Sequence, residues 1–307
     1  MNKEMWWLPA VNAVVISQYL IFTNWHDAKA GTIANIFMLA IAIIGYGTWH
    51  FSNKYKSEVQ SFLPQTVNAD SFLTENDIQH LPEPVKTYIR YADDVGKPKV
   101  NNFKVEFTGQ MRADERSAWM PFTSVQYNFM DAPARLFFMK ASMKQLPVAG
   151  YHSFNNGSAF MDIRLLSLFR VQYQSGKEMN ISETVTFFND MCCMAPATLI
   201  DKRITWSDVD SNQVKATFTN NSISIAARLY FNEQGELVNF ITEDRYASTA
   251  DKQMKRFPWA TPLKDYTLMN GYKVPAHADV IYKYPEGDFC YGNFKLTDIE
   301  YNCMEYK

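Results

Sequence analysis

Few side chains in this sequence have the type and spacing needed for metal or acid–base chemistry. His277 and Asp279 lie two residues apart on an expected strand, so they share a face and could ligate a metal ion if His152 joined them. An isolated strand histidine is more often exposed or hydrogen bonded, and no C-x-x-C or H-E-x-x-H motif occurs. The sequence therefore predicts no metal site and no cofactor.

Acidic side chains cluster beside arginines at two places. Residues 114–115 lie between Arg112 and Arg116 in an expected hairpin tip, where solvated charges are the simplest interpretation. Residues 243–245 (Glu-Asp-Arg) end an expected strand beside Tyr246. At this second cluster, a buried ion pair and a contact with a ligand are equally good interpretations.

An enzyme would need Arg112, His152, Asp244 or Arg245 to converge in one pocket. The sequence contains no G-x-S-x-G elbow, no P-loop and no G-x-G-x-x-G fingerprint. We therefore favour a non-enzymatic role, with a hydrolase-like enzyme that has an unrecognised site as an alternative.

Aromatic and sulfur-containing side chains favour binding of an apolar molecule. The chain has 22 Phe, 17 Tyr, 7 Trp and 15 Met, and such side chains can line a cavity for a lipid or other apolar ligand. An ordinary aromatic core gives the same pattern. The candidate ligand-binding residues are Arg112, Trp119, Gln126, His152, Trp206, Arg245 and Trp259.

The N-terminal region is predicted to hold the rest of the chain at a membrane. Met5–Trp25 and Ala30–Asn53 contain no charged residue, and each is about as long as the ~20 residues that a helix needs to cross a bilayer. We predict a transmembrane helical hairpin over residues 1–53, with spans at about 5–25 and 31–51. The alternatives are a signal peptide followed by one anchor and a soluble helical hairpin.

Basic residues near the ends of the runs predict the orientation. Lys3, Lys54 and Lys56 flank one side and Lys29 alone flanks the other. The positive-inside rule then places both termini and the large domain in the cytoplasm, in a multi-pass membrane protein.

The rest of the chain is predicted to be mainly β (α+β). Residues 54–80 are expected to form a linker, and residues 81–307 one antiparallel β domain that starts with a helix near 84–92. A second helix, with Ile181, Val185, Phe188 and Met191 on one face, interrupts the strands. Alternating polar and apolar residues predict strands near 103–112, 121–130, 135–143, 148–154, 158–165, 168–174, 202–208, 212–219, 222–231, 236–244, 263–269, 272–284 and 289–301.

This pattern favours a large curved antiparallel sheet or open barrel with one or two helices plugging its concave side. A net charge of −2 provides no electrostatic footprint for nucleic acid. Four cysteines are too few for a disulfide scaffold, and we expect free thiols, with a Cys290–Cys303 pair left open.

Scattered positions over residues ~24–302 resemble a family of uncharacterised bacterial proteins whose members often carry an N-terminal membrane segment. The stretch Trp25–Asn35 resembles their membrane hairpin. The matching residues of the domain are Leu81-Pro-x-Pro-Val-x-x-Tyr-x-Arg-Tyr91, Gly109-Gln-Met-Arg112, Trp119-x-Pro-Phe122, Gln126, Gly150, Gly157-x-Ala-x-Met161, Ala195-Pro196, Trp206, Gly235, Asp244-Arg245, Trp259, Pro262, Tyr266, Gly271 and Pro275.

The resemblance implies a fold similar to the lipoprotein-carrier (LolA-like) type, in a protein of the bacterial inner membrane. It implies no activity. Carriers of this type work outside the cytoplasm, which conflicts with the basic-residue bias, so both sides of the membrane stay open. The leading hypothesis is a membrane-anchored protein that binds a lipid or other apolar ligand. A protein-interaction or scaffold domain with a solid core is the alternative.

Overall fold

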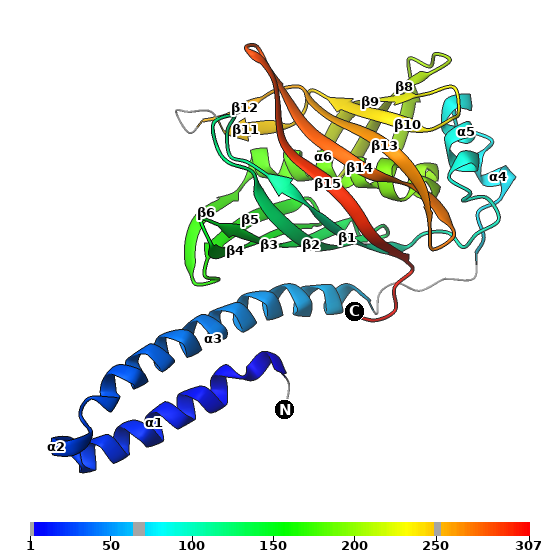
Figure 1. Ribbon diagram of the computed structural model, residues 1–307. Coiled ribbons are helices and arrows are strands. Elements are labelled where there is room, and N and C mark those ends of the chain that lie inside the picture. Colours follow the sequence, from blue (N-terminus) through cyan, green and yellow to red (C-terminus); the bar gives the residue numbers. More distant parts are fainter. Residues whose placement is uncertain (1–2, 64–70, 249–252) are drawn as a thin grey trace.

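A large curved sheet forms most of the molecule. The computed structural model describes residues 3–63, 71–248 and 253–307 (Figure 1). The sheet contains 13 antiparallel strands in the order β6-β5-β4-β3-β2-β1-β15-β14-β13-β10-β9-β8-β7. Its strands are β1 (Asn102–Met111), β2 (Met120–Phe129), β3 (Ala134–Met143), β4 (Leu146–Asn155), β5 (Ser158–Leu165), β6 (Phe169–Ser175), β7 (Ile204–Ser207), β8 (Gln213–Asn220), β9 (Ile223–Phe231), β10 (Leu237–Thr242), β13 (Trp259–Met269), β14 (Tyr272–Tyr284) and β15 (Gly287–Tyr301).

Most of the predicted strands are confirmed, and so is the fold class. In the described part of the chain the end strands β6 and β7 each pair on one side only, so the sheet is curved without being closed. Asn156 and Gly157 both have positive φ, 50° and 79°, as a type I′ hairpin turn between β4 and β5 requires.

The stretch between the predicted strands 236–244 and 263–269 contains strands that were not predicted. A short hairpin of β11 (Tyr246–Ser248) and β12 (Met254–Arg256) forms a separate two-stranded sheet, and β13 begins at Trp259 instead of residue 263. Three-residue strands are too short to produce a visible alternation. Within this stretch, residues 249–252 lie outside the described residues.

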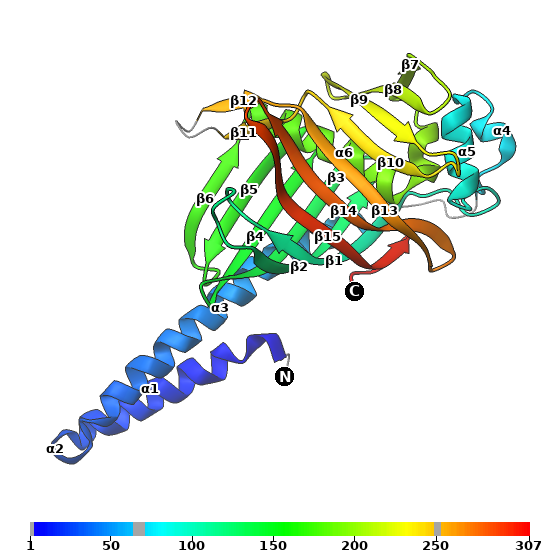
Figure 2. The same cartoon turned by 45° about the horizontal axis from the view of Figure 1, so that its top comes forward.

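Helix α6 (Lys177–Met194) fills the concave side of the sheet (Figure 2). It contacts β4, β5 and β6 of one half of the sheet and β9, β10 and β14 of the other. Its apolar residues Val185, Phe188 and Met191 are fully buried, as the helical spacing predicted. Two shorter helices, α4 (Glu75–Ile78) and α5 (Glu83–Tyr91), and the 3-10 helix η3 (Pro196–Ile200) complete the main core.

Helix α3 (Gly31–Phe62) covers the opposite, convex side of the sheet (Figure 1). Its C-terminal half packs on β2, β3 and β4 through Phe51, Tyr55 and Val59. The Tyr55 hydroxyl donates to the Val125 carbonyl at 3.1 Å, and Glu58 accepts from Tyr151 at 2.5 Å and from Ser153 at 2.7 Å. Because α6 and α3 cover both faces, all residues from Ala134 to Met139 in β3 are buried.

The expected linker at 54–80 therefore differs from the structure. Residues 54–62 continue α3 without a break and pack on the domain, and Glu75–Ile78 is helical. Hydrophobic residues spaced for one helix face, Phe51, Tyr55, Val59 and Phe62, account for the continuation. Residues 64–70 lie outside the described residues.

One helix among the described residues, α3, is long and apolar enough to cross a membrane. Helix α1 (Trp7–Thr23) has 17 residues, fewer than the ~20 that a span needs, so the expectation of two spanning helices is not supported. A single turn of helix, α2 (Trp25–Ala28), joins α1 to α3. Across the two long helices, Gln18 donates to Thr32 at 3.1 Å and Asn35 donates to Gln18 at 3.0 Å.

The contributions of the two halves of α3 to stability can be compared by substituting one phenylalanine in each half. Phe51 is 1% exposed against Phe138 and Tyr151, whereas Phe37 on the apolar half is 67% exposed. We predict that Phe51→Ala lowers the free energy of unfolding by about 3–5 kcal/mol, the usual cost of emptying a buried phenylalanine site. Phe37→Ala should have little effect on the domain. Thermal and guanidinium unfolding of the full chain in nanodiscs, followed by near-UV circular dichroism, measures both. Unchanged stability of Phe51→Ala would show that this contact of α3 does not stabilise the domain.

Candidate functional site

A cavity lies between α6 and the concave face of the sheet. Its volume is about 380 Å³, within the ~300–1,000 Å³ typical of small-molecule sites. Its walls are mainly apolar, and six methionines contribute to them: Met111, Met139, Met161, Met179, Met194 and Met254. The aromatic lining residues are Phe107, Phe137, Tyr246, Trp259, Tyr282, Tyr284, Phe289, Tyr291 and Phe294. Long unbranched methionine side chains adapt to irregular apolar surfaces, so these walls suit a flexible apolar ligand.

The cavity reaches the protein surface at one end, which we call the rim. The rim consists of residues that line the cavity and come from three segments: Arg112 and Ala113 of the β1–β2 loop, Gln172 and Gln174 of β6, and Ser248 and Met254 of the β11–β12 hairpin. Several of these side chains are exposed. Gln174 and Met254 approach each other at 4.0 Å between Nε2 and Sδ. The hairpin that the sequence did not predict therefore forms part of the rim.

Polar side chains on one wall form a buried ionic network centred on Arg135. Its Nε donates to Asp190 at 2.7 Å, Nη1 to Glu183 at 3.0 Å and Nη2 to Gln126 at 2.8 Å. Asp190 also accepts from Gln126 at 2.8 Å and from Asn128 at 3.2 Å. All three guanidinium nitrogens thus have partners, and the network ties α6 to β2 and β3.

The two carboxyl groups of this network respond differently to burial. Burial raises the pKa of Glu183, but Arg135 and His152 outweigh it and hold the pKa at about 2. The Nδ1 of His152 lies 3.7 Å from Glu183. For Asp190, burial has the larger effect and raises the pKa, although Arg135, Asn128 and Gln126 oppose it. Glu183 is therefore the firmly ionised partner of Arg135.

Arg245 lies on another wall of the same cavity, and its hydrogen-bond partners among the described residues are all neutral. Its Nη1 donates to the Ser182 carbonyl at 3.0 Å and to the Thr186 hydroxyl, and its Nε donates to the Tyr282 hydroxyl at 3.2 Å. The guanidinium lies over the Trp259 ring, 4.6 Å from its centroid. These contacts fix the guanidinium in one position beside the cavity.

Five of the seven residues predicted from sequence line this cavity: Arg112, Gln126, His152, Arg245 and Trp259. Trp119 does not line it, but lies at the rim with its ring 4.6 Å from the Arg112 guanidinium. Trp206 lies on β7, at the far end of the sheet, and packs against the main core. The ligand-binding roles of all seven remain predictions.

The four residues considered for an enzyme, Arg112, His152, Asp244 and Arg245, do not all lie in one pocket. Arg112, His152 and Arg245 line the cavity, whereas Asp244 accepts from the Ala226 amide at 2.8 Å and from Arg256 at 3.1 Å outside it. Among the described residues no group of three His, Cys, Asp or Glu side chains could hold a metal ion. Cys192, Cys193, Cys290 and Cys303 are all free thiols.

Arg135, Glu183 and Asp190 were not predicted from the sequence as site residues. A signal was present on α6, because Ser182, Glu183, Thr186, Asn189 and Asp190 recur at helical spacing and form a polar stripe opposite the apolar face. All five are buried or nearly so. Polar groups on one face of a helix normally indicate that this face is exposed to solvent. The sequence alone therefore did not predict that the stripe is buried.

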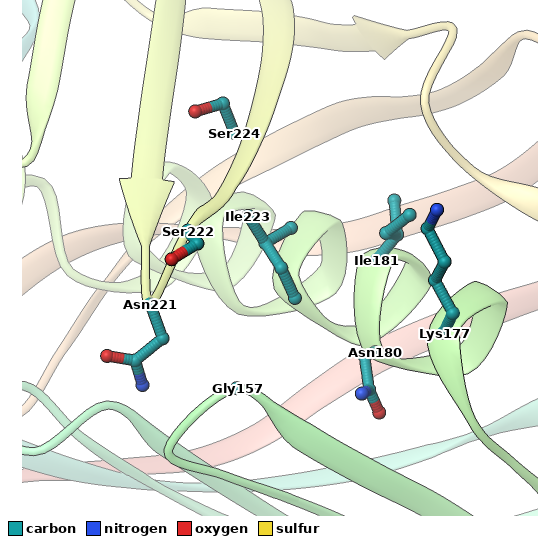
Figure 3. Close-up of a pocket in the computed structure, with 8 residues that line it drawn as sticks. All are labelled: Gly157, Lys177, Asn180, Ile181, Asn221, Ser222, Ile223 and Ser224. Atoms are coloured by element: carbon teal, nitrogen blue, oxygen red, sulfur yellow. The ribbon is translucent and has the colours of Figure 1, made fainter.

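A second pocket, of about 490 Å³, opens beside the first turn of α6 (Figure 3). It lies between the β4–β5 turn at Gly157 and the β8–β9 turn at Asn221. Its amides are already engaged, since Asn221 donates to Asn156 at 2.5 Å and Asn180 accepts from the Ala159 amide at 2.8 Å. The described residues that line it include no carboxylate, histidine or thiol. We therefore place the functional site in the cavity beneath the sheet.

A scan against family models identifies residues 71–294 as a match to the family of unknown function DUF6544. The chain belongs to this family, and the match confirms the resemblance to a family without a known activity. No match is found among curated proteins.

Several solved structures are similar to this chain at low identity. A LolA superfamily protein from Nitrosomonas europaea is 9% identical, with 71% of this chain and 93% of that chain covered and a TM-score of 0.34. A domain assigned as an outer membrane lipoprotein-sorting protein from Vibrio parahaemolyticus is 5% identical, with 66% and 85% covered and a TM-score of 0.38. A DUF1329 family protein from Desulfovibrio piger is 8% identical, with 71% and 91% covered and a TM-score of 0.29.

The pKa of Glu183 predicts an acid-dependent loss of stability. Because the folded-state pKa of about 2 lies below the ordinary value of 4.5, the stabilisation is fully present above pH 4.5 and is lost as pH falls towards 2. Its size is about 3 kcal/mol at ~1.36 kcal/mol per pKa unit. We expect Glu183→Gln to be less stable than the unsubstituted chain at pH 7, with a difference that shrinks by about this amount between pH 5 and pH 2.

Guanidinium unfolding at a series of pH values measures this difference. The control is Glu233→Gln, because Glu233 is exposed. A pH-independent difference for Glu183→Gln would contradict the assignment of Glu183 as the ionised partner.

Proposed function

We propose that this protein holds an apolar or amphiphilic molecule, such as the acyl chain of a lipid, in the cavity between α6 and the sheet. The observation that supports the proposal is the composition of the cavity. Six methionines and nine aromatic residues form walls around about 380 Å³ of space, and the polar groups gather at a few defined points. Sites for small apolar molecules combine these two features.

The anchor supports a ligand that comes from the membrane. We propose that α3 spans the bilayer with α1 packed along it, and that the rigid continuation of α3 into the domain keeps the cavity close to the lipid surface. Tethering of this kind raises the local concentration of membrane molecules at the site. The side of the membrane remains a prediction, for which the basic residues favour the cytoplasm.

Strand β6 provides a route between the anchor and the rim. The β5–β6 turn packs on α3, where a Cβ at Gly47 would lie only 2.3 Å from the Leu168 side chain. From there β6 runs to the rim, a length of about 20 Å for seven residues at ~3.3 Å each. Phe169, Val171 and Tyr173 on its outer face are 62%, 53% and 48% exposed. We propose that this apolar strip lies along the bilayer surface and guides the ligand to the cavity.

Filling the cavity tests the proposal. Ala278 of β14 lines the cavity, and Ala278→Phe should occupy much of the space. Native mass spectrometry of the full chain, ejected from nanodiscs that contain bacterial lipid extract, should show a retained lipid adduct. The substitution should reduce the adduct fraction about tenfold, as expected if a large ring displaces most of the ligand's contact area.

The control is Ala132→Phe, which makes the same change at an exposed turn residue. Thermal unfolding checks that Ala278→Phe remains folded, since an added ring in a packed region costs about 1–3 kcal/mol. An adduct that is absent from the unsubstituted chain, or equal in both variants, would refute a lipid in this cavity.

A further inference from the structure

We infer that the cavity selects amphiphiles with an anionic head group, and that Arg245 binds the anion. This inference rests on the proposed function and adds the chemical class of the ligand. It follows from how the charged side chains around the cavity are paired.

The charges that line the cavity do not balance. Among the described residues, the lining includes three arginines, Arg112, Arg135 and Arg245, and two carboxylates, Glu183 and Asp190. Both carboxylates accept hydrogen bonds from Arg135. One positive charge is therefore in excess even with both carboxylates ionised, and a bound anion would neutralise it.

Arg245 is the arginine placed to receive the anion. Among the described residues it forms no ion pair with a carboxylate, and its three protein acceptors, Ser182, Thr186 and Tyr282, bind Nη1 and Nε. Its Nη2 has no acceptor in this part of the chain and remains available. A guanidinium offers five donors in a rigid fork, and a carboxylate or phosphate can use two of them at once.

The surroundings strengthen this interaction. The guanidinium is held between α6, Tyr282 and the face of Trp259, so it does not need to reorganise when a ligand arrives. Away from bulk water, an interaction between opposite charges is stronger than at an exposed site. The apolar walls around Met161 and Phe294 can accept the chain of the same molecule.

Arg112 contributes charge from the rim. Its Nε donates to the Cys290 carbonyl at 2.9 Å and its Nη1 to the Glu115 carbonyl at 3.3 Å, so neutral groups hold it as well. An anionic molecule that enters at the rim therefore meets Arg112 before it reaches Arg245. Arg135, by contrast, is fully occupied and serves to position α6.

Photoaffinity labelling of the full chain in phosphatidylcholine nanodiscs tests the inference. The probes are a diazirine-bearing palmitic acid, its methyl ester and an alkyl phosphate with the same diazirine chain. For each probe, labelling of peptides from β5, α6 and β14 is divided by labelling of peptides from α1 and α3. This ratio corrects for how much of each probe enters the bilayer.

We expect the ratio for the acid or the phosphate to exceed that for the neutral ester about tenfold, which corresponds to about 1.4 kcal/mol. The probe with the higher ratio identifies the head group as a carboxylate or a phosphate. Equal ratios for acid, phosphate and ester would overturn the anion selectivity and leave apolar binding intact. Labelling confined to α1 and α3 with every probe would overturn the proposed function itself.

Variants then assign the selectivity to Arg245. Arg245→Gln should bring the ratios for acid and ester together, and Arg245→Lys, which keeps the charge, should retain part of the difference. Arg228→Gln is the control, because Arg228 lies on β9 outside the cavity and its nearest carboxylate, on Asp208, is 3.8 Å away. A preference for the acid that survives in a folded Arg245→Gln protein would overturn the assignment. If that variant does not fold, the comparison of acid and ester on the unsubstituted chain still decides the selectivity.

Discussion

The architecture depends on how the sheet accommodates a helix that carries buried charges. Helix α6 is enclosed by the sheet, so its polar stripe cannot face water. Arg135 on β3 resolves this, because its three guanidinium nitrogens bind Glu183, Asp190 and Gln126. Removing one partner of such a network leaves an uncompensated buried charge, which is far more costly than never having built the network. The network therefore fixes the position of α6, and with it the space that remains between the helix and the sheet.

The same strands connect the cavity to helix α3. Successive side chains of a strand point to opposite faces, so in β3 Arg135 and Phe137 face the cavity while Leu136 and Phe138 face α3. In β4, His152 faces the cavity while Tyr151 contacts Glu58 of α3. One layer of backbone thus separates α3 from the site that we propose for the ligand. Because α3 continues into this contact without a break, the domain has a defined orientation relative to the apolar half of α3.

Local signals accounted for much of the fold, whereas the contacts between distant segments did not follow from them. The alternation in β1 to β5 and the apolar spacing of α6 were sufficient to predict a curved antiparallel sheet with a plugging helix. The continuation of α3 beyond residue 51 was missed, because its polar residues suggested a linker while its buried face contacts strands about 70 residues away, as in the Tyr55–Val125 hydrogen bond. Arg135 was missed for a similar reason, since its partners on α6 are 48 and 55 residues distant.

The ionic network also explains why an apolar cavity can persist beneath the sheet. An apolar gap beneath a sheet tends to close, because packing its walls together recovers dispersion contacts. Here α6 cannot move towards the opposite wall without separating Glu183 and Asp190 from Arg135, and it cannot rotate without placing charged groups against methionine side chains. Arg245 adds a second restraint by joining the segment before β11 to the Ser182 carbonyl and to Thr186. The walls are thus held apart by polar contacts at their edges, and the apolar space between them remains free for a ligand that the flexible methionine side chains can surround.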